Sequence, residues 1–138
     1  MNLENTSASI EQELNNLKKA YAIIEEREAS LLTFYNSVSQ MLGVVDVTAT
    51  DVRNVLVNET AVQFRGEPRE KFQGAWASEL GVPQERINQW IQRYHQAEQE
   101  KRPVEFEYSI EIKGDVRWLL ATVRFIERLS DEMIRCSF

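Results

Sequence analysis

The chain has 138 residues, of which 43% are apolar and 28% charged, which suits one soluble globular domain with an appended segment. Its 16 basic and 22 acidic residues give a net charge of −6, which argues against nucleic acid or an anionic membrane as a partner. A single cysteine, Cys136, excludes an internal disulfide and a cysteine-based metal site, and no stretch of about 18 apolar residues or leader-like segment is present. These features predict a cytoplasmic protein.

Residues 1–42 are predicted to form one long amphipathic helix. Two interleaved series, each with a period of seven, run through the segment: Leu3, Ile10, Leu17, Ile24, Leu31 and Val38 in the first, and Leu14, Tyr21, Glu28, Tyr35 and Leu42 in the second, where the charge of Glu28 weakens the seam. Spacings that alternate between four and three are typical of the a and d positions of a helix that packs against another helix. Two interpretations remain open: packing on its own domain, or a parallel dimeric coiled coil that carries a conformational change. A helix of about 33 residues spans roughly 50 Å, longer than a domain of ~95 residues is wide, which favours a dimer over part of its length.

Residues 43–103 are predicted to alternate between short strands and helices. Branched apolar residues at 44–47 and 54–57 indicate two strands of a hairpin, and in its glycine-free loop we expect Asp51 or Asn54 to adopt the positive φ. Asn58 has the character of an N-cap for a short helix that ends at Gly66. A second helical turn is expected over 67–74, and the apolar spacing after Pro83 predicts an amphipathic helix that continues to about Lys101.

The last third of the chain is predicted to form antiparallel strands. Apolar and polar residues alternate from Val104 to Ile112, and Gly114-Asp115 is expected to be the hairpin turn. That turn would pair Tyr108 with Ala121 and would place the glutamates on the outer face of the sheet. Three large apolar residues share this outer face: Trp118, Leu120 and Ile126. Because an apolar patch of this size is rarely left wet, we expect the N-terminal helix or a second copy of the chain to cover it.

Several segments stand in an order and at a spacing typical of one known family: 43–46 and 55–58 in the first two strands, Ala61 and Gly66 in the first short helix, 67–74 in the second, and 106–108 with 114–119 in the terminal hairpin. In these segments the chain resembles the PAS domain family. The resemblance covers residues 43–138. It implies an α+β fold with a five-stranded antiparallel sheet and helices on one face, preceded here by the long helix of 1–42. It also implies a sensory module of bacterial signalling proteins, such as sensor histidine kinases or diguanylate cyclases, with an output domain after residue 138.

The resemblance also directs attention to a pocket where helices cover the sheet. The candidate lining residues are Asn58, Phe64, Trp76, Trp90, Tyr94, Tyr108 and Thr122. Aromatic residues at helical spacing more often fill a core than hold a ligand, so a relay element without a ligand remains an alternative. No cofactor is predicted: flavin chemistry in the family needs a cysteine in the helical region, and His95, the one possible haem ligand, flanks the apolar stripe of its helix.

The sequence predicts a non-catalytic sensory input or dimerisation module that relays a change through its flanking helix. The expected partners are a second copy of the chain, a small-molecule ligand and the output domain. Six residues are candidates for the dimer or helix-docking face: Leu17, Ile24, Leu31, Trp118, Leu120 and Ile126. No phosphate-binding loop, nucleophile motif or metal-ligand spacing is found, so no catalytic or metal residues are predicted. The alternative is a small cone-shaped α+β enzyme or binding protein with a pocket under a curved sheet.

Overall fold

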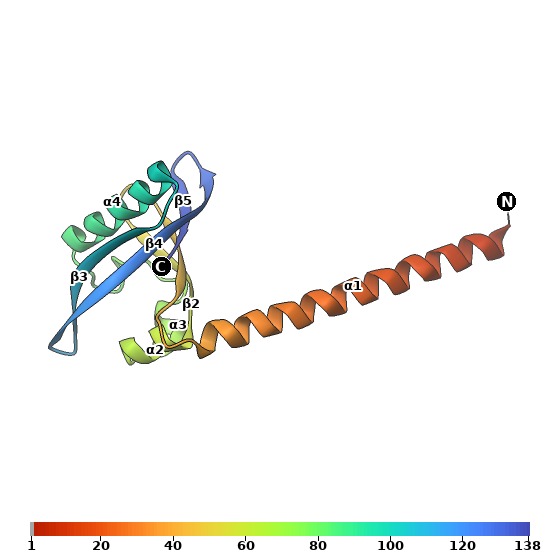
Figure 1. Cartoon of the computed structure of the whole chain (residues 1–138), viewed down its shortest axis with the longest axis horizontal. Helices are drawn as coiled ribbons and strands as arrows, with labels where there is room; N and C mark the ends of the chain where they lie inside the picture. Colours follow the sequence, from red (N-terminus) through yellow and green to blue (C-terminus); the bar gives the residue numbers. More distant parts are fainter. Residues whose placement is uncertain (1) are drawn as a thin grey trace. The chain divides into compact units, whose positions relative to one another are not determined.

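The computed structural model describes residues 2–138 and contains four helices and five strands (Figure 1). The first helix, α1, runs from Leu3 to Ser37. The chain divides into two compact units, of which the first ends at Ser37 and the second comprises Val38–Phe138. Residues 38–42, which the sequence assigned to the helix, therefore belong to the unit that contains the sheet.

The second unit is built on a five-stranded sheet in the order β2-β1-β5-β4-β3. The strands are β1 (Gly43–Val47), β2 (Val52–Val57), β3 (Val104–Ile112), β4 (Asp115–Ser130) and β5 (Met133–Ser137). Each neighbouring pair is antiparallel. The central position of β5, the last strand, brings the end of the chain beside its first strand. The predicted α+β fold with a five-stranded antiparallel sheet is confirmed.

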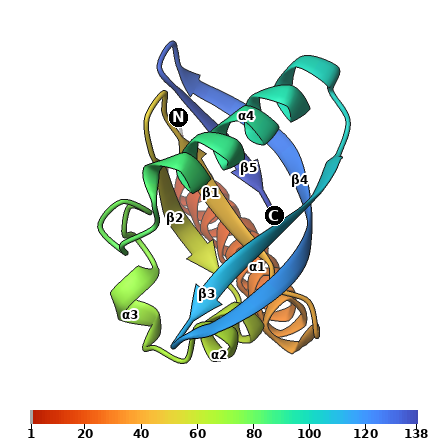
Figure 2. The same cartoon turned by 90° about the vertical axis from the view of Figure 1, so that its left-hand side faces the viewer.

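Three helices connect β2 to β3: α2 (Glu59–Arg65), α3 (Arg69–Phe72) and α4 (Gln84–Glu100). Asn58 caps α2 as predicted, because its side chain accepts a hydrogen bond from the amide of Ala61. Gly66 ends α2 with a φ of 70°, a left-handed conformation that glycine adopts without steric cost. The longest of the three, α4, crosses one face of the curved sheet (Figure 2) and buries Ile87, Ile91, Tyr94 and Ala97.

The hairpin of β3 and β4 has the predicted faces but not the predicted register. Tyr108 pairs with Leu119 instead of Ala121, and Ile112 pairs with Asp115. The turn residues are therefore Lys113 and Gly114, both with positive φ, at 52° and 86°. A two-residue turn with both φ values positive matches the twist of the strands, so Lys113 accepts a left-handed conformation. Since partners move by two residues, every side chain keeps its face, and the apolar and acidic sides stay separated.

The loop between β1 and β2 closes without the positive φ that was expected at Asp51 or Asn54. The non-glycine residues with positive φ among residues 2–138 are Lys101 and Lys113. In this loop the hydroxyl of Thr48 instead accepts a hydrogen bond from the amide of Asp51, at 3.0 Å. The Asp51 carboxylate in turn accepts one from the amide of Val52, at 2.9 Å. These side-chain bonds stabilise the turn in place of a glycine.

Candidate ligand-binding site

A cavity of about 170 Å³ lies between the inner face of the sheet and the connecting helices. Side chains of β1 to β4 line it from the sheet side, and side chains of α2, α3 and α4 line it from the other. Most of the lining is apolar, and Asn54, Thr122, Tyr94 and Tyr108 add polar atoms. An apolar cavity of this size favours a small apolar body, since a cavity of about 150 Å³ lined by aliphatic and aromatic side chains can hold benzene.

The apolar period of α4 forms the aromatic wall of this cavity. Tyr94, on the buried stripe, and Trp90, beside it, both line the cavity. The ring of Trp90 meets that of Tyr108 on β3 edge to face, with centroids 5.6 Å apart and planes at 79°. Such a geometry is favourable for aromatic pairs and fixes both rings. The wall is therefore set by packing between a helix and a strand that adjoin in sequence.

The structure brings five of the seven predicted pocket residues together around the cavity. They are Phe64, Trp90, Tyr94, Tyr108 and Thr122. Asn58 and Trp76 are not part of the lining. Asn58 is fully buried as the cap of α2, and Trp76 forms a bridge with Arg53 beside β2. Asn58 is therefore buried for a structural reason, whereas Trp76 is partly buried outside the lining.

Two lining residues that the sequence analysis missed come from opposite ends of the second unit. Met41 precedes β1, and Phe138 follows β5. The backbones of Phe138 and Gly43 exchange two hydrogen bonds of 3.0 and 3.1 Å. A side chain at Gly43 would overlap the ring of Phe138, which explains why the smallest residue occupies this position. No local sequence signal predicts this contact, because the two residues are distant along the chain.

The ionisable groups of the lining are Arg65, Tyr94 and Tyr108. Burial raises the pKa of both tyrosines, and the charges of Arg65 and Arg86 oppose this rise at Tyr108. Both phenols are therefore neutral at physiological pH and present O–H groups that donate or accept hydrogen bonds. The cavity thus combines apolar walls with neutral hydroxyls and one cation.

Four arginines lie over aromatic rings that line this cavity. Arg65 lies over Phe72, and Arg117 over Phe64, each with its guanidinium carbon 6.0 Å from the ring centroid. On α4, Arg86 and Arg93 lie over the rings of Tyr108 and Phe106 at 5.7 and 5.6 Å. Each contact is a cation–π interaction. Arg65 differs from the other three because it also lines the cavity.

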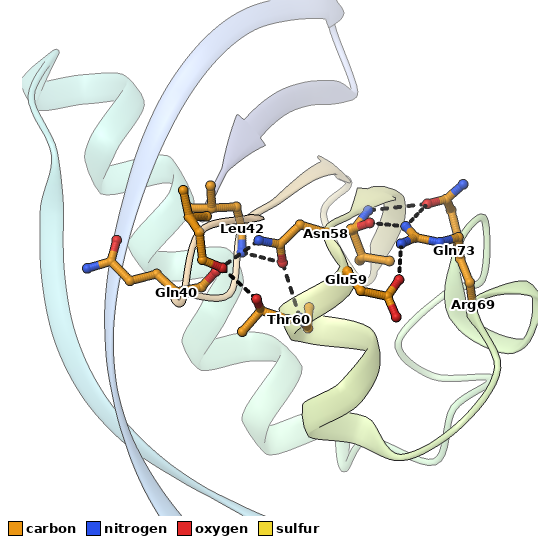
Figure 3. Close-up of polar contacts among 10 residues, drawn as sticks. Gln40, Leu42, Asn58, Glu59, Thr60, Arg69 and Gln73 are labelled. Carbon is orange, nitrogen blue, oxygen red and sulfur yellow. Dashed lines mark hydrogen bonds and ion pairs between the residues drawn. The ribbon is translucent and has the colours of Figure 1, made fainter. Parts of the chain in front are cut away.

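Asn58 anchors the segment that precedes β1 (Figure 3). Its side-chain oxygen accepts a hydrogen bond from the amide of Leu42 at 2.9 Å, and its side-chain nitrogen donates one to the carbonyl of Gln40 at 2.9 Å. The hydroxyl of Thr60 donates to the carbonyl of Val38 at 2.6 Å. Residues 38–42 are therefore held to the start of α2 by side chains that also belong to its first turn. This segment is the N-terminal joint of the second unit.

Arg69 connects α3 to the same region (Figure 3). Its guanidinium donates hydrogen bonds to the carbonyl of Val57, to Gln73 at 3.2 Å and to the carboxylate of Glu59 at 3.0 Å. Val57 and Glu59 flank Asn58, and Phe72 on α3 lines the cavity. A continuous set of contacts thus runs from the cavity wall through α3 to the N-terminal joint.

The candidate docking residues are all exposed. On the outer face of the sheet, the exposed fractions of Trp118, Leu120 and Ile126 are 74%, 67% and 48%. On α1, the three candidates Leu17, Ile24 and Leu31 are exposed to similar degrees. Covering of these residues remains a prediction.

His95 and Cys136 lie outside the cavity lining. His95 is within 3.8 Å of the carboxylate of Glu98 on the same helix, and Cys136 is fully buried in β5. Over residues 2–138, no group of three or more His, Cys, Asp or Glu side chains is arranged to hold a metal ion. In the same part of the chain, no helix is long and apolar enough to cross a membrane.

Comparison with solved structures reveals the fold. The chain is 15% identical to the PAS domain of an HTR-like protein from Haloarcula marismortui, with a TM-score of 0.64 and coverage of 88% of this chain and 98% of that one. It is 13% identical to the PAS domain of BvgS from Bordetella pertussis, with a TM-score of 0.56 and coverage of 81% and 82%. The fold is that of a PAS domain. No family sequence profile and no curated protein matches the chain.

The cavity and the N-terminal joint both belong to the second unit, which has this fold. The cavity lies under α4, and the joint lies where β1 begins. At identities of 13% and 15% the shared property is the backbone arrangement, so what the cavity accepts has to be argued from the side chains of this chain.

Proposed function

We propose that this chain is a non-catalytic sensory input module of a cytoplasmic signal-transduction protein, in which the PAS domain binds a small molecule. The observation that carries the proposal is an apolar cavity whose lining includes residues at both ends of the domain, Met41 and Phe138. A ligand that fills the cavity would contact the residue before β1 and the residue after β5. Changes in cavity occupancy would therefore act on the two points where the domain joins flanking segments.

The proposal includes a relay through the N-terminal joint. A ligand that displaces Phe72 would move α3, and Arg69 would transmit that movement to Val57 and Glu59, on either side of Asn58. Asn58 holds the backbone of Gln40 and Leu42, which leads to α1. For the relay to operate, this packed, hydrogen-bonded path would need a second arrangement that the bound ligand favours.

We further propose that α1 acts as a parallel homodimeric coiled coil. From Ile10 to Leu31 its a and d positions are apolar except for Glu28, and its large apolar side chains are exposed in the single chain. An output domain after residue 138, such as a histidine kinase or a diguanylate cyclase, would receive the change. Dimerisation would allow two sensory domains to act on one pair of output domains.

Native mass spectrometry of the protein purified from cells, together with its absorption spectrum, tests ligand binding and dimerisation in one measurement. We expect a dimer that retains a small molecule. The variant Ala121→Phe, which places a ring in the cavity, should lose that molecule, whereas Ala49→Phe in the exposed β1–β2 loop should keep it. A molecule retained equally by both variants, or an apo protein that also fails to bind benzene, would argue against a ligand sensor. A monomer would contradict the coiled coil. A Soret band in the absorption spectrum would indicate bound haem, with His95 as the candidate ligand.

Hydrogen exchange tests the relay. With benzene as the probe, the amides of Leu42 and Gly43 should change their protection when the cavity fills. Arg69→Gln should weaken this response, while Lys71→Gln on the same helix should leave it intact, because Lys71 is exposed and pairs with Glu67 alone among residues 2–138. An equal response in both variants would show that the signal does not pass through Arg69.

A further inference from the structure

Arg65 is the single charged residue in the cavity lining described over residues 2–138. It is the last residue of α2, where a cation interacts favourably with the helix dipole. That position explains a basic residue at the end of α2, but an exposed side chain would serve the dipole equally well. Arg65 is instead half-buried against an apolar cavity, so its charge is partly desolvated. Stabilising the helix end does not require this free-energy cost.

The partners of Arg65 do not include an anion. Other arginines of the domain pair with carboxylates: Arg69 with Glu59 at 3.0 Å, and Arg135 with Asp46 at 2.8 Å. Within the described chain, Arg65 makes no ion pair within 4.0 Å, and the ring of Phe72 is its one cation–π partner. A ring face offsets part of the desolvation of a guanidinium, but its fork of N–H donors remains available to a planar, bidentate acceptor.

Tyr108 supplies a second polar group in the lining of the same cavity. Its hydroxyl is neutral, as burial raises its pKa, and the charge of Arg65 is close enough to act on it. Its ring meets Trp90 edge to face and lies under the guanidinium of Arg86. The lining of this apolar cavity therefore contains a guanidinium and a phenol, each of which can donate a hydrogen bond to an anionic oxygen.

We propose that the cavity binds a small monocarboxylate whose body is an aromatic ring or a short apolar chain, with Arg65 as the counter-ion of the carboxylate. This inference rests on the proposed function, since it names the class of ligand that the sensor accepts. The cavity of about 170 Å³ accommodates a body about the size of benzene. A carboxylate at its rim would receive charge-assisted hydrogen bonds from the fork of Arg65 and a further one from Tyr108.

Two carboxylates of the protein lie near enough to compete with such a ligand. Glu67 and Glu111 line a neighbouring hollow that Arg65 also borders. Glu67 already pairs with Lys71 at 3.4 Å. A bound carboxylate would therefore draw Arg65 towards the cavity and away from this hollow, whose lining also includes Lys113, and this would couple ligand binding to the end of α2.

Calorimetric titration with benzoate and with its neutral isostere benzamide tests the proposal on the full chain. We expect benzoate to bind at least about tenfold more tightly than benzamide, because a hydrogen bond to a charged group contributes more than a neutral one. Arg65→Gln should reduce benzoate to the level of benzamide and leave benzamide unchanged. Arg117→Gln is the matched control, as this arginine lies over an aromatic ring of the lining but is not itself part of it.

The outcomes separate this inference from the function on which it rests. If benzamide and benzene bind but benzoate has no advantage, the carboxylate assignment is wrong and the ligand sensor stands. If benzoate retains its advantage in Arg65→Gln, another group binds the anion and the role of Arg65 is overturned. If none of the three probes binds to the folded wild-type protein, both proposals fail. Circular dichroism of each variant establishes that the domain remains folded, and Arg65→Lys should restore part of the preference if charge is what matters.

Discussion

Helices α1 and α4 both carry an apolar stripe, and they differ in what covers it. In α4 the stripe is buried against the sheet, with Ile87 and Ala97 fully inaccessible. In α1, none of the side chains of Leu3–Ser37 is buried, and Ile24 is 59% exposed. The comparison shows that helical periodicity identifies the face of a helix that needs a partner, while the partner itself depends on the surfaces that tertiary or quaternary structure brings to it.

The largest effect should come from truncating the covered stripe. Ile87→Ala removes a fully buried side chain under α4 and should lower the free energy of unfolding by about 2–5 kcal/mol. Urea unfolding followed by circular dichroism measures the loss. Gln92→Ala, on the exposed side of the same helix, should change stability by less than about 0.5 kcal/mol. Equal effects at the two positions would mean that α4 does not pack as described.

The uncovered stripe should affect association instead of folding. Two adjacent isoleucines of α1 provide a matched pair, since Ile24 is at a predicted d position and Ile23 lies outside the a and d positions. Ile24→Asp should weaken dimerisation by about 100-fold or more, because it would place a charge in the helix seam. Ile23→Asp should leave the dissociation constant within about threefold of wild type. Sedimentation velocity over a concentration series measures both, and a stable Ile24→Asp dimer would contradict the coiled coil.

The outer face of the sheet provides a second surface whose covering is predicted. Leu120→Asp should weaken dimerisation or docking of the helix by about tenfold if this face is covered, because the buried leucine would be replaced by a charge. Sedimentation and thermal unfolding together distinguish the two cases. Glu107 of β3 pairs with Leu120, and Glu107→Asp is the control because it keeps the charge. Unchanged association and unchanged thermal stability in Leu120→Asp would mean that the face remains open to solvent.

The smallest expected effect is a pH dependence that reports the burial under α4. Burial raises the pKa of Cys136 from 9.0 to about 12, and Tyr94 in the same core cluster is shifted in the same direction. The unfolded thiol ionises first, so stability is retained below pH 9 and falls as the pH rises towards 12. One such group contributes a slope of at most about 1.4 kcal/mol per pH unit. Chemical unfolding at several pH values should give a shallower slope for Cys136→Ala than for wild type; an equal slope would assign the effect to other groups.

Features that depend on neighbours in sequence were predictable. The order of strands and helices, the cap at Asn58, the end of α2 at Gly66 and the two faces of β3 all follow from local periodicity and capping chemistry. The predicted hairpin register differed from the observed one by two residues, because two dipeptides, Lys113-Gly114 and Gly114-Asp115, are both compatible with a tight turn. The faces alone could not choose between them, since both registers bury the same side chains.

The candidate site was predictable in its aromatic wall and in Thr122, but not in the role of Asn58. Trp90, Tyr94 and Tyr108 follow the apolar periods of α4 and β3, so their direction is set locally. Asn58 was expected to line the pocket, but the structure uses its amide to hold the N-terminal joint. A short polar side chain after a strand is compatible with either role, and the approach of residues 40–42 decides between them.

The amino-acid sequence specifies the elements of this protein, their order and the apolar face of each one, because these depend on residues within a few positions of one another. The tertiary structure decided that Phe138 packs on Gly43 and that Met41 reaches the cavity. Each of these relations joins residues that are distant along the chain and come together when the sheet and its helices fold. Their geometry follows from the global packing of the domain, which no local pattern encodes.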